Sequence, residues 1–68
     1  MWEVQVHDDG EVQIRKVPAS YKSRGTTLVF QDSDSLVSEV SSYGKEDADI
    51  DAAVQEAECD EYQWVTVG

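Results

Sequence analysis

Two short segments near the start of the chain alternate apolar and polar residues, and this pattern restricts the fold more than any other feature. The segments cover residues 2–6 and 12–16, and Asp8-Asp9-Gly10 lies between them. Alternation with a period of two predicts two strands, joined here as a hairpin. A three-residue loop at residues 8–10 is favoured over a two-residue loop, because it places apolar side chains opposite one another and Gly10 at the left-handed position. This register pairs Val6 with Val12, Val4 with Ile14, and Trp2 with the stem of Lys16.

The rest of the chain predicts one further strand, two helices and a last strand. After the polar segment 18–26, residues 27–31 are mostly β-branched or aromatic and should form a third strand. Asp32, Ser33 and Asp34 are favourable N-cap residues for a short helix that ends at Gly44. A second helix is expected over residues 46–60, and a last strand over residues 62–67. The expected fold is α+β: a small antiparallel sheet, made of the N-terminal hairpin, the third strand and the C-terminal strand, with one or two helices packed on one face.

The length and the apolar content predict a single small domain with a thin core. Domains usually have about 100–150 residues, and this chain has 68. Leucine, isoleucine, valine and phenylalanine make up 15 of the 68 residues, just above the fraction of about 20 % below which highly charged chains stay disordered. We expect one domain over residues 1–68, with a β-rich part (1–31), a helical part (32–61) and the last strand (62–67).

The excess of negative over positive charge lies entirely in the second part of the chain. Residues 1–31 contain four acidic and four basic residues, whereas residues 32–68 contain eleven acidic residues and one basic residue, Lys45. The net charge of −10 therefore belongs to the helical part. Such a charge repels phosphate backbones and anionic lipids, which argues against direct binding of nucleic acid or a membrane. The partners it attracts are cations and basic protein surfaces.

The second expected helix carries most of this charge in two rows. A projection at about 100° per residue puts Ile50, Ala53, Val54 and Ala57 on one face, which should be buried. Asp47, Asp51 and Glu58 flank this face on one side, and Asp49, Glu56 and Asp60 flank it on the other. Like charges at this spacing destabilise a helix, and almost no lysine offsets them. The candidate partner-binding residues are Asp47, Asp49, Asp51, Glu56, Glu58 and Asp60, with Glu46, Asp32 and Asp34 beside them.

Three interpretations of these rows compete. A solvated surface is the ordinary explanation of a run of charges. A small acidic adaptor or structural module from a salt-loving organism is the second, but such acidification should cover the whole surface, and residues 1–31 are neutral. The third, which we favour, is that the carboxylates imitate backbone phosphates and bind the basic groove of a nucleic-acid-binding protein.

Part of the same segment matches the spacing of an EF-hand calcium loop. Acidic residues stand at loop positions 1, 3, 5 and 12, from Asp47 to Glu58, and Val54 is the aliphatic residue at position 8. However, the glycine required at position 6 is Ala52, and the residues after Glu58 favour a strand rather than an exiting helix. Weak calcium binding is therefore an alternative that we do not favour.

The chain has few side chains that could carry catalysis or hold a metal. It contains one histidine, His7, and one cysteine, Cys59, too few for a zinc site. His7 stands at the end of a predicted strand and is expected to be a surface residue rather than a general base. We expect no enzyme activity, cofactor or metal. No apolar run exceeds three residues, which predicts neither a membrane span nor a signal peptide, and Cys59 alone cannot form an internal disulfide. A cytoplasmic protein is expected.

Two further features lie outside the acidic segment. The loop Tyr21-Lys22-Ser23-Arg24-Gly25 is the only basic and aromatic stretch. It is expected to be a solvated connection or to contact the acidic part of the molecule, although it could also stack on nucleic acid bases. Trp2 and Trp64 are expected in the core, because a thin core needs large side chains.

The small size, the one-sided acidity and the lack of catalytic motifs resemble the small acidic inhibitors that phages encode, which include DNA mimics and some anti-CRISPR proteins. This resemblance implies a stoichiometric inhibitor of a nucleic-acid-handling host enzyme or CRISPR effector complex, acting in the host cytoplasm. An exposed sheet edge and a thin core are compatible with a monomer or a homodimer.

Overall fold

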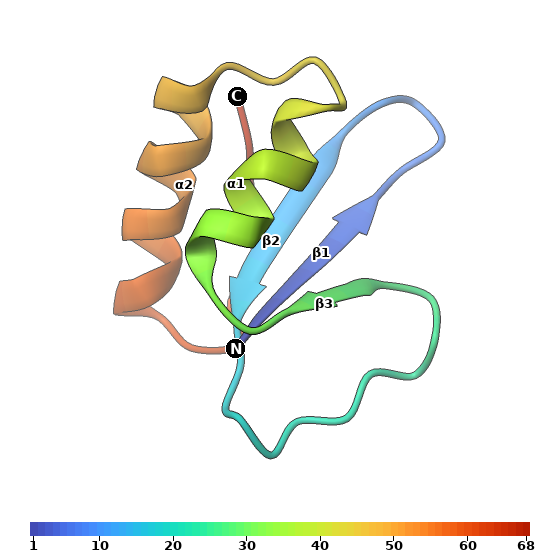
Figure 1. The fold of residues 1–68 in the computed structure, drawn as a ribbon, viewed down its shortest axis with the longest axis vertical. Helices are drawn as coiled ribbons and strands as arrows, with labels where there is room; N and C mark the ends of the chain where they lie inside the picture. Colours follow the sequence, from blue (N-terminus) through green and yellow to red (C-terminus); the bar gives the residue numbers. More distant parts are fainter.

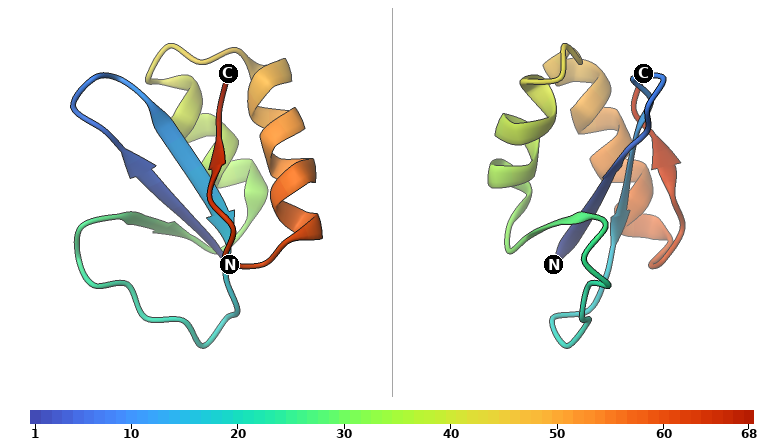
Figure 2. Two further views of the ribbon diagram at one scale, coloured as in Figure 1. Left: turned by 180° about the vertical axis from the view of Figure 1, so that it is seen from behind. Right: turned by 90° about the vertical axis from the view of Figure 1, so that its right-hand side faces the viewer.

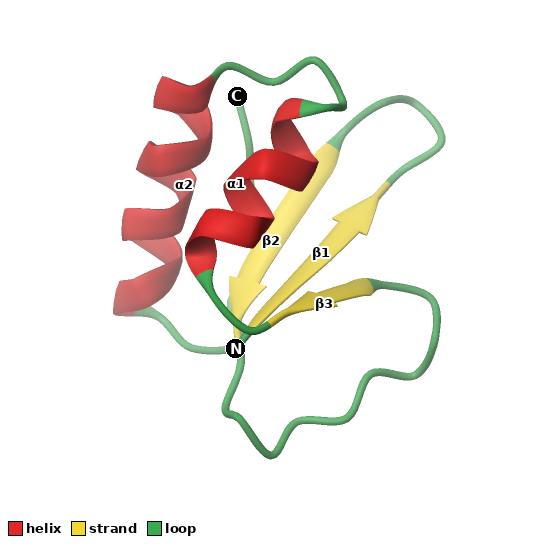
Figure 3. Ribbon diagram, viewed as in Figure 1, coloured by secondary structure: helices red, strands yellow, loops and turns green.

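The strands and helices follow one another in the order that the sequence predicts, and they form two layers (Figures 1 and 3). The computed structural model describes all 68 residues. The elements are β1 (Trp2–Val6), β2 (Val12–Lys16), β3 (Leu28–Phe30), α1 (Ser33–Ser41), α2 (Asp47–Cys59) and β4 (Val65–Thr66). The strands form an antiparallel sheet in the order β3-β1-β2-β4, and both helices cover one face of it (Figure 2). The predicted α+β fold is confirmed.

The predicted hairpin register is confirmed residue by residue. Val6 pairs with Val12, Val4 with Ile14, and Trp2 with Lys16. In the loop, the Gly10 N–H donates to the His7 carbonyl at 3.0 Å, and the His7 N–H donates to the Glu11 carbonyl at 2.8 Å. Gly10 has a φ of +92°, which explains why glycine is needed there.

The two outer strands are shorter than expected. β3 covers three residues rather than 27–31, and β4 covers two residues rather than 62–67. The last segment still follows β2 at both ends, because the Tyr62 N–H donates to the Lys16 carbonyl and the Val67 N–H donates to the Val12 carbonyl. A turn at Asp60–Gln63 and the left-handed backbone of Tyr62 (φ +69°) prevent regular pairing before Val65.

The core lies between the sheet and the helices. Twelve buried side chains form it, and Trp2, 2 % exposed, is the largest. The sheet contributes Trp2, Val4, Val12, Ile14, Val65 and Val67, and the helices contribute Leu36, Val40, Ile50, Ala53, Val54 and Ala57. The four buried residues of α2 are those that the helical projection predicted. Each large aliphatic side chain buried in this way stabilises the fold by about 1.5–3 kcal/mol.

Both helices end close to the expected positions and run in opposite directions. Asp32 is the N-cap of α1, and its carboxylate accepts a hydrogen bond from the Ser35 N–H at 2.8 Å. The N-terminal end of α1 and the C-terminal end of α2 therefore lie at the same end of the molecule (Figure 1). Neither helix has the length and apolar character needed to cross a membrane.

Candidate functional site

The nine sequence-predicted site residues are all exposed on the helical layer. We call them the acidic helical surface: Asp47, Asp49, Asp51, Glu56, Glu58 and Asp60 on and directly after α2, Glu46 directly before it, and Asp32 and Asp34 at the start of α1. Because the apolar face of α2 packs on the sheet, its two acidic rows point to solvent on either side. The structure thus brings the α2 residues together along one helix. The start of α1, which carries Asp32 and Asp34, lies at the same end of the molecule as the C-terminal end of α2 (Figure 1).

No basic side chain neutralises this surface. The structure contains one ion pair, between Glu3 and Arg15, and both partners belong to the sheet. Lys22 and Arg24 are exposed and form no ion pair, so the loop that carries them does not neutralise the carboxylates of the acidic helical surface. Lys45 also lacks an acidic partner. The uncompensated charge therefore remains on the helical layer.

The carboxylates of the acidic helical surface differ in whether they form hydrogen bonds within the molecule. That of Asp32 caps α1, and the hydrogen bond from Ser35 lowers the pKa of Asp32. Glu46 occupies the N-cap position of α2, but its side chain makes no capping hydrogen bond. Asp32 therefore has a structural role in addition to any role in binding, whereas Glu46 is free to contact a partner.

The calcium alternative requires a loop where the structure has a helix. Residues 47–58 lie within α2, which is continuous from Asp47 to Cys59. At a rise of about 1.5 Å per residue, Asp47 and Glu58 lie roughly 16 Å apart along the helix axis. Ligands of one calcium ion must all lie within about 2.6 Å of it. The acidic spacing therefore does not form an EF-hand loop.

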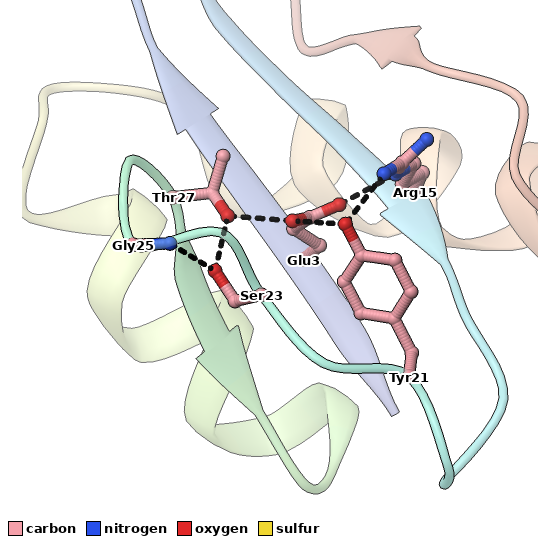
Figure 4. Close-up of polar contacts among 6 residues, drawn as sticks. All are labelled: Glu3, Arg15, Tyr21, Ser23, Gly25 and Thr27. Atoms are coloured by element: carbon pink, nitrogen blue, oxygen red, sulfur yellow. Dashed lines mark hydrogen bonds and ion pairs between the residues drawn. The ribbon is translucent and has the colours of Figure 1, made fainter.

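A second polar site lies on the face of the sheet opposite the helices (Figure 4). Glu3 on β1 is 2 % exposed, the only buried charged residue of the molecule. Its carboxylate accepts hydrogen bonds from Arg15 Nε at 2.6 Å, from the Tyr21 hydroxyl at 3.0 Å and from the Thr27 hydroxyl. We call these four residues the Glu3 network. It fixes the loop between β2 and β3 against the sheet.

The Glu3 network holds both of its charged groups in their ionised forms. Burial alone would raise the pKa of Glu3, but hydrogen bonds from Thr27, Arg15 and Tyr21 outweigh it and hold this pKa below its ordinary value. Burial alone would lower the pKa of Arg15, and its bond to Glu3 raises this pKa instead. The pair is therefore a salt bridge at neutral pH.

Aromatic rings surround the Arg15 guanidinium. Its central carbon lies 4.5 Å from the ring centre of Trp64, 5.4 Å from that of Tyr21 and 5.8 Å from that of Tyr62. Trp64 is thus half-buried on the sheet face rather than in the core, whereas Trp2 is in the core as predicted. These groups line an open cleft of about 460 Å³, which we call the sheet-face cleft.

Tyr62 has an unusual backbone conformation in this cleft. It is the only residue other than glycine with a positive φ, +69°. A bulky residue rarely adopts this conformation, and it costs about 1–2 kcal/mol. The turn nevertheless places the Tyr62 ring edge-on to Tyr21, with a distance of 6.3 Å between ring centres. Tyr62 as a whole remains 50 % exposed.

One signal for the Glu3 network is present in the sequence. The predicted hairpin register pairs Glu3 with Arg15, and such opposite charges attract each other across a sheet. The positions of Tyr21 and Thr27 carry no comparable signal, because they depend on how an irregular loop folds over the sheet.

Comparisons of the chain with protein-family models, curated proteins and solved structures give no match.

Proposed function

We propose that this protein is a non-enzymatic inhibitor, of the DNA-mimic or anti-CRISPR type. Its acidic helical surface would bind the basic groove of a nucleic-acid-binding protein, such as a CRISPR effector complex, and exclude the nucleic acid. The observation that carries this proposal is the lack of any basic partner for the carboxylates of that surface. A partner supplying arginine and lysine side chains would complete the pairing that the molecule itself lacks.

The density of charge along α2 supports the proposal. Seven carboxylates stand between residues 46 and 60, a span of roughly 21 Å at about 1.5 Å per residue. This amounts to about one negative charge per 3 Å, close to the one per ~3.4 Å of a nucleic acid strand. A groove that binds a phosphate backbone would therefore meet a similar linear charge on this helix.

The rigidity of the surface also favours binding. The buried face of α2 is anchored in the core by Ile50, Ala53, Val54 and Ala57. The helix backbone that carries the carboxylates is thus held in place before a partner arrives, which reduces the backbone entropy lost on binding. A disordered acidic tail of the same charge would lose more entropy on binding.

The acidic module of a salt-loving organism remains the second interpretation, but the distribution of charge does not favour it. Adaptation to high salt should acidify the sheet face as well. That face instead carries Lys22 and Arg24 without acidic partners. Circular dichroism in low and in molar salt distinguishes the two interpretations. A salt-adapted protein should unfold in low salt, whereas the proposed inhibitor should stay folded.

The proposal is tested by competition with nucleic acid. CRISPR effectors and other nucleic-acid-binding proteins are assayed for DNA or RNA binding with and without this protein. We expect the wild-type chain to displace nucleic acid from its target, and the double variant Asp49→Lys with Glu56→Lys to lose this effect. The matched control is Asp8→Lys with Glu11→Lys, which changes the net charge equally in the exposed hairpin loop. Equal losses in both variants would contradict a localised site.

A further inference from the structure

The sheet-face cleft has a local charge opposite to that of the whole molecule. Glu3 and Arg15 neutralise each other within the cleft. Lys22 and Arg24 also line it, and neither forms an ion pair. The cleft therefore has a formal charge of +2 in a protein whose net charge is −10.

Most of the acidic helical surface lies on the opposite side of the sheet and the core from the cleft, and its exception is Asp60, two residues before Tyr62 in the chain. In Figure 4 the Glu3 network lies on the near face of the strands, while the helices lie behind them. Lys22 and Arg24 line the cleft itself and have no acidic partner, so a small ligand in the cleft would meet these two charges directly.

Aromatic rings give the cleft a second kind of binding group. Tyr62 is half-exposed at its rim, and Trp64 and Tyr21 lie beside Arg15. Flat ligands stack on such rings, and on the guanidinium plane of arginine, without needing a specific pattern of hydrogen bonds. The strained backbone of Tyr62 belongs to the same cleft, and strain of this kind gathers at binding sites.

Taken together, cations beside aromatic rings suit a ligand that has both a flat ring and an anionic group. We infer that the sheet-face cleft binds a nucleoside phosphate, with the base stacked on Tyr62 and the phosphate held by Lys22 and Arg24. Its volume of about 460 Å³ lies within the range of roughly 300–1,000 Å³ that is usual for small-molecule sites. This site is independent of the acidic helical surface and of the inhibitor function proposed above.

The ligand could be a free mononucleotide or the terminal nucleotide of a single strand. Titration calorimetry at physiological salt, with adenosine monophosphate, adenosine and ribose 5-phosphate as probes, tests the shared chemistry. We expect the monophosphate to bind about tenfold more tightly than either half of it, because stacking and charge both contribute. A 5′-phosphorylated dinucleotide distinguishes the sources: tighter binding than the monophosphate indicates the end of a strand, and weaker binding a free nucleotide.

Two pairs of variants locate the site. Lys22→Glu with Arg24→Glu, and separately Tyr62→Ala, should each weaken binding of the monophosphate about tenfold. Lys45→Glu and Tyr43→Ala alter a lysine and an exposed tyrosine that do not line the cleft, and should leave binding unchanged.

Amide spectra verify that each variant is folded, and in the wild type the shifts on binding should map to residues 21–27 and 62–64. No saturable binding at millimolar concentrations, equal affinity for ribose 5-phosphate, or equal losses in the control variants would overturn the inference.

Discussion

Glu3 and the carboxylates of α2 show the same chemical group in two different environments. Glu3 is buried, and three side chains donate hydrogen bonds to it. The α2 carboxylates are exposed and have no basic partner. A buried charge is stable only when it is paired and hydrogen-bonded, whereas an exposed one needs neither. Glu3 is therefore a structural residue, and charge reversal at Glu3 cannot serve as a surface control in binding experiments.

Replacing Glu3 with glutamine should destabilise the protein by about 2 kcal/mol at pH 7, because it leaves the partly buried Arg15 without its anion. Glutamine keeps the size of the side chain and some of its hydrogen bonds, so the fold should survive. Urea unfolding followed by tryptophan fluorescence measures the change. A variant as stable as the wild type would show that the Glu3 network does not hold the loop.

The pH dependence of this difference follows from the pKa of Glu3. That pKa is lower in the folded state than its ordinary value of 4.5, so the stabilisation is complete above about pH 4.5. It is lost as the pH falls through the folded-state pKa. The wild type and Glu3→Gln should therefore differ in stability at pH 7 and converge in acid. A difference in the free energy of unfolding that stays constant down to pH 2 would contradict an ionised Glu3.

Asp32 and Asp34 should differ in their contributions to stability. Asp32 caps α1 through its bond to Ser35, whereas Asp34 lies in the first turn and makes no hydrogen bond to the backbone. Asp32→Ala should therefore lower the Tm by several degrees, and Asp34→Ala by less. Scanning calorimetry of the two variants makes the comparison. Equal shifts would show that the cap is not what stabilises the start of α1.

At the level of strands and helices, the periodicity of apolar residues predicted the regular elements well, whereas the sequence of the loops did not predict their conformation. Period-two alternation was sufficient for the hairpin register, and the helical projection was sufficient for the buried face of α2, because both depend on one dominant buried surface. Both outer strands were predicted too long, and in β4 the turn before Trp64 interrupts the pairing. The loop over the sheet face could not be predicted, because its position depends on Glu3, far away in sequence.

Helix α2 combines a stabilising buried face with exposed rows of like charges. Glu56→Lys replaces one of these charges and creates an opposite-charge pair with Asp60, four residues on, near the C-terminal end of the helix. It should raise the free energy of unfolding by a few tenths of a kcal/mol while weakening inhibition. Urea unfolding and the competition assay measure these two effects. A stabilised variant with full inhibitory activity would mean that this row is only a solvated surface.

At the scale of the whole molecule, two layers separate two kinds of surface. The helical layer carries uncompensated carboxylates, and the opposite sheet face carries a cleft with free basic and aromatic side chains. The sequence predicted the first surface, because charge can be counted along a chain. It did not predict the second, because the cleft is assembled from β1, β2, the loop between β2 and β3, and the segment before β4.

The salt dependence of target binding shows whether the acidic helical surface acts as a phosphate mimic. If the acidic helical surface replaces a phosphate backbone, the affinity for the target should fall steeply as salt is raised from about 50 to 200 mM, by at least tenfold. Under the same conditions the protein should compete with DNA or RNA for the target. An affinity that does not change with salt, or a complex in which the target still binds nucleic acid normally, would contradict phosphate mimicry by the acidic helical surface.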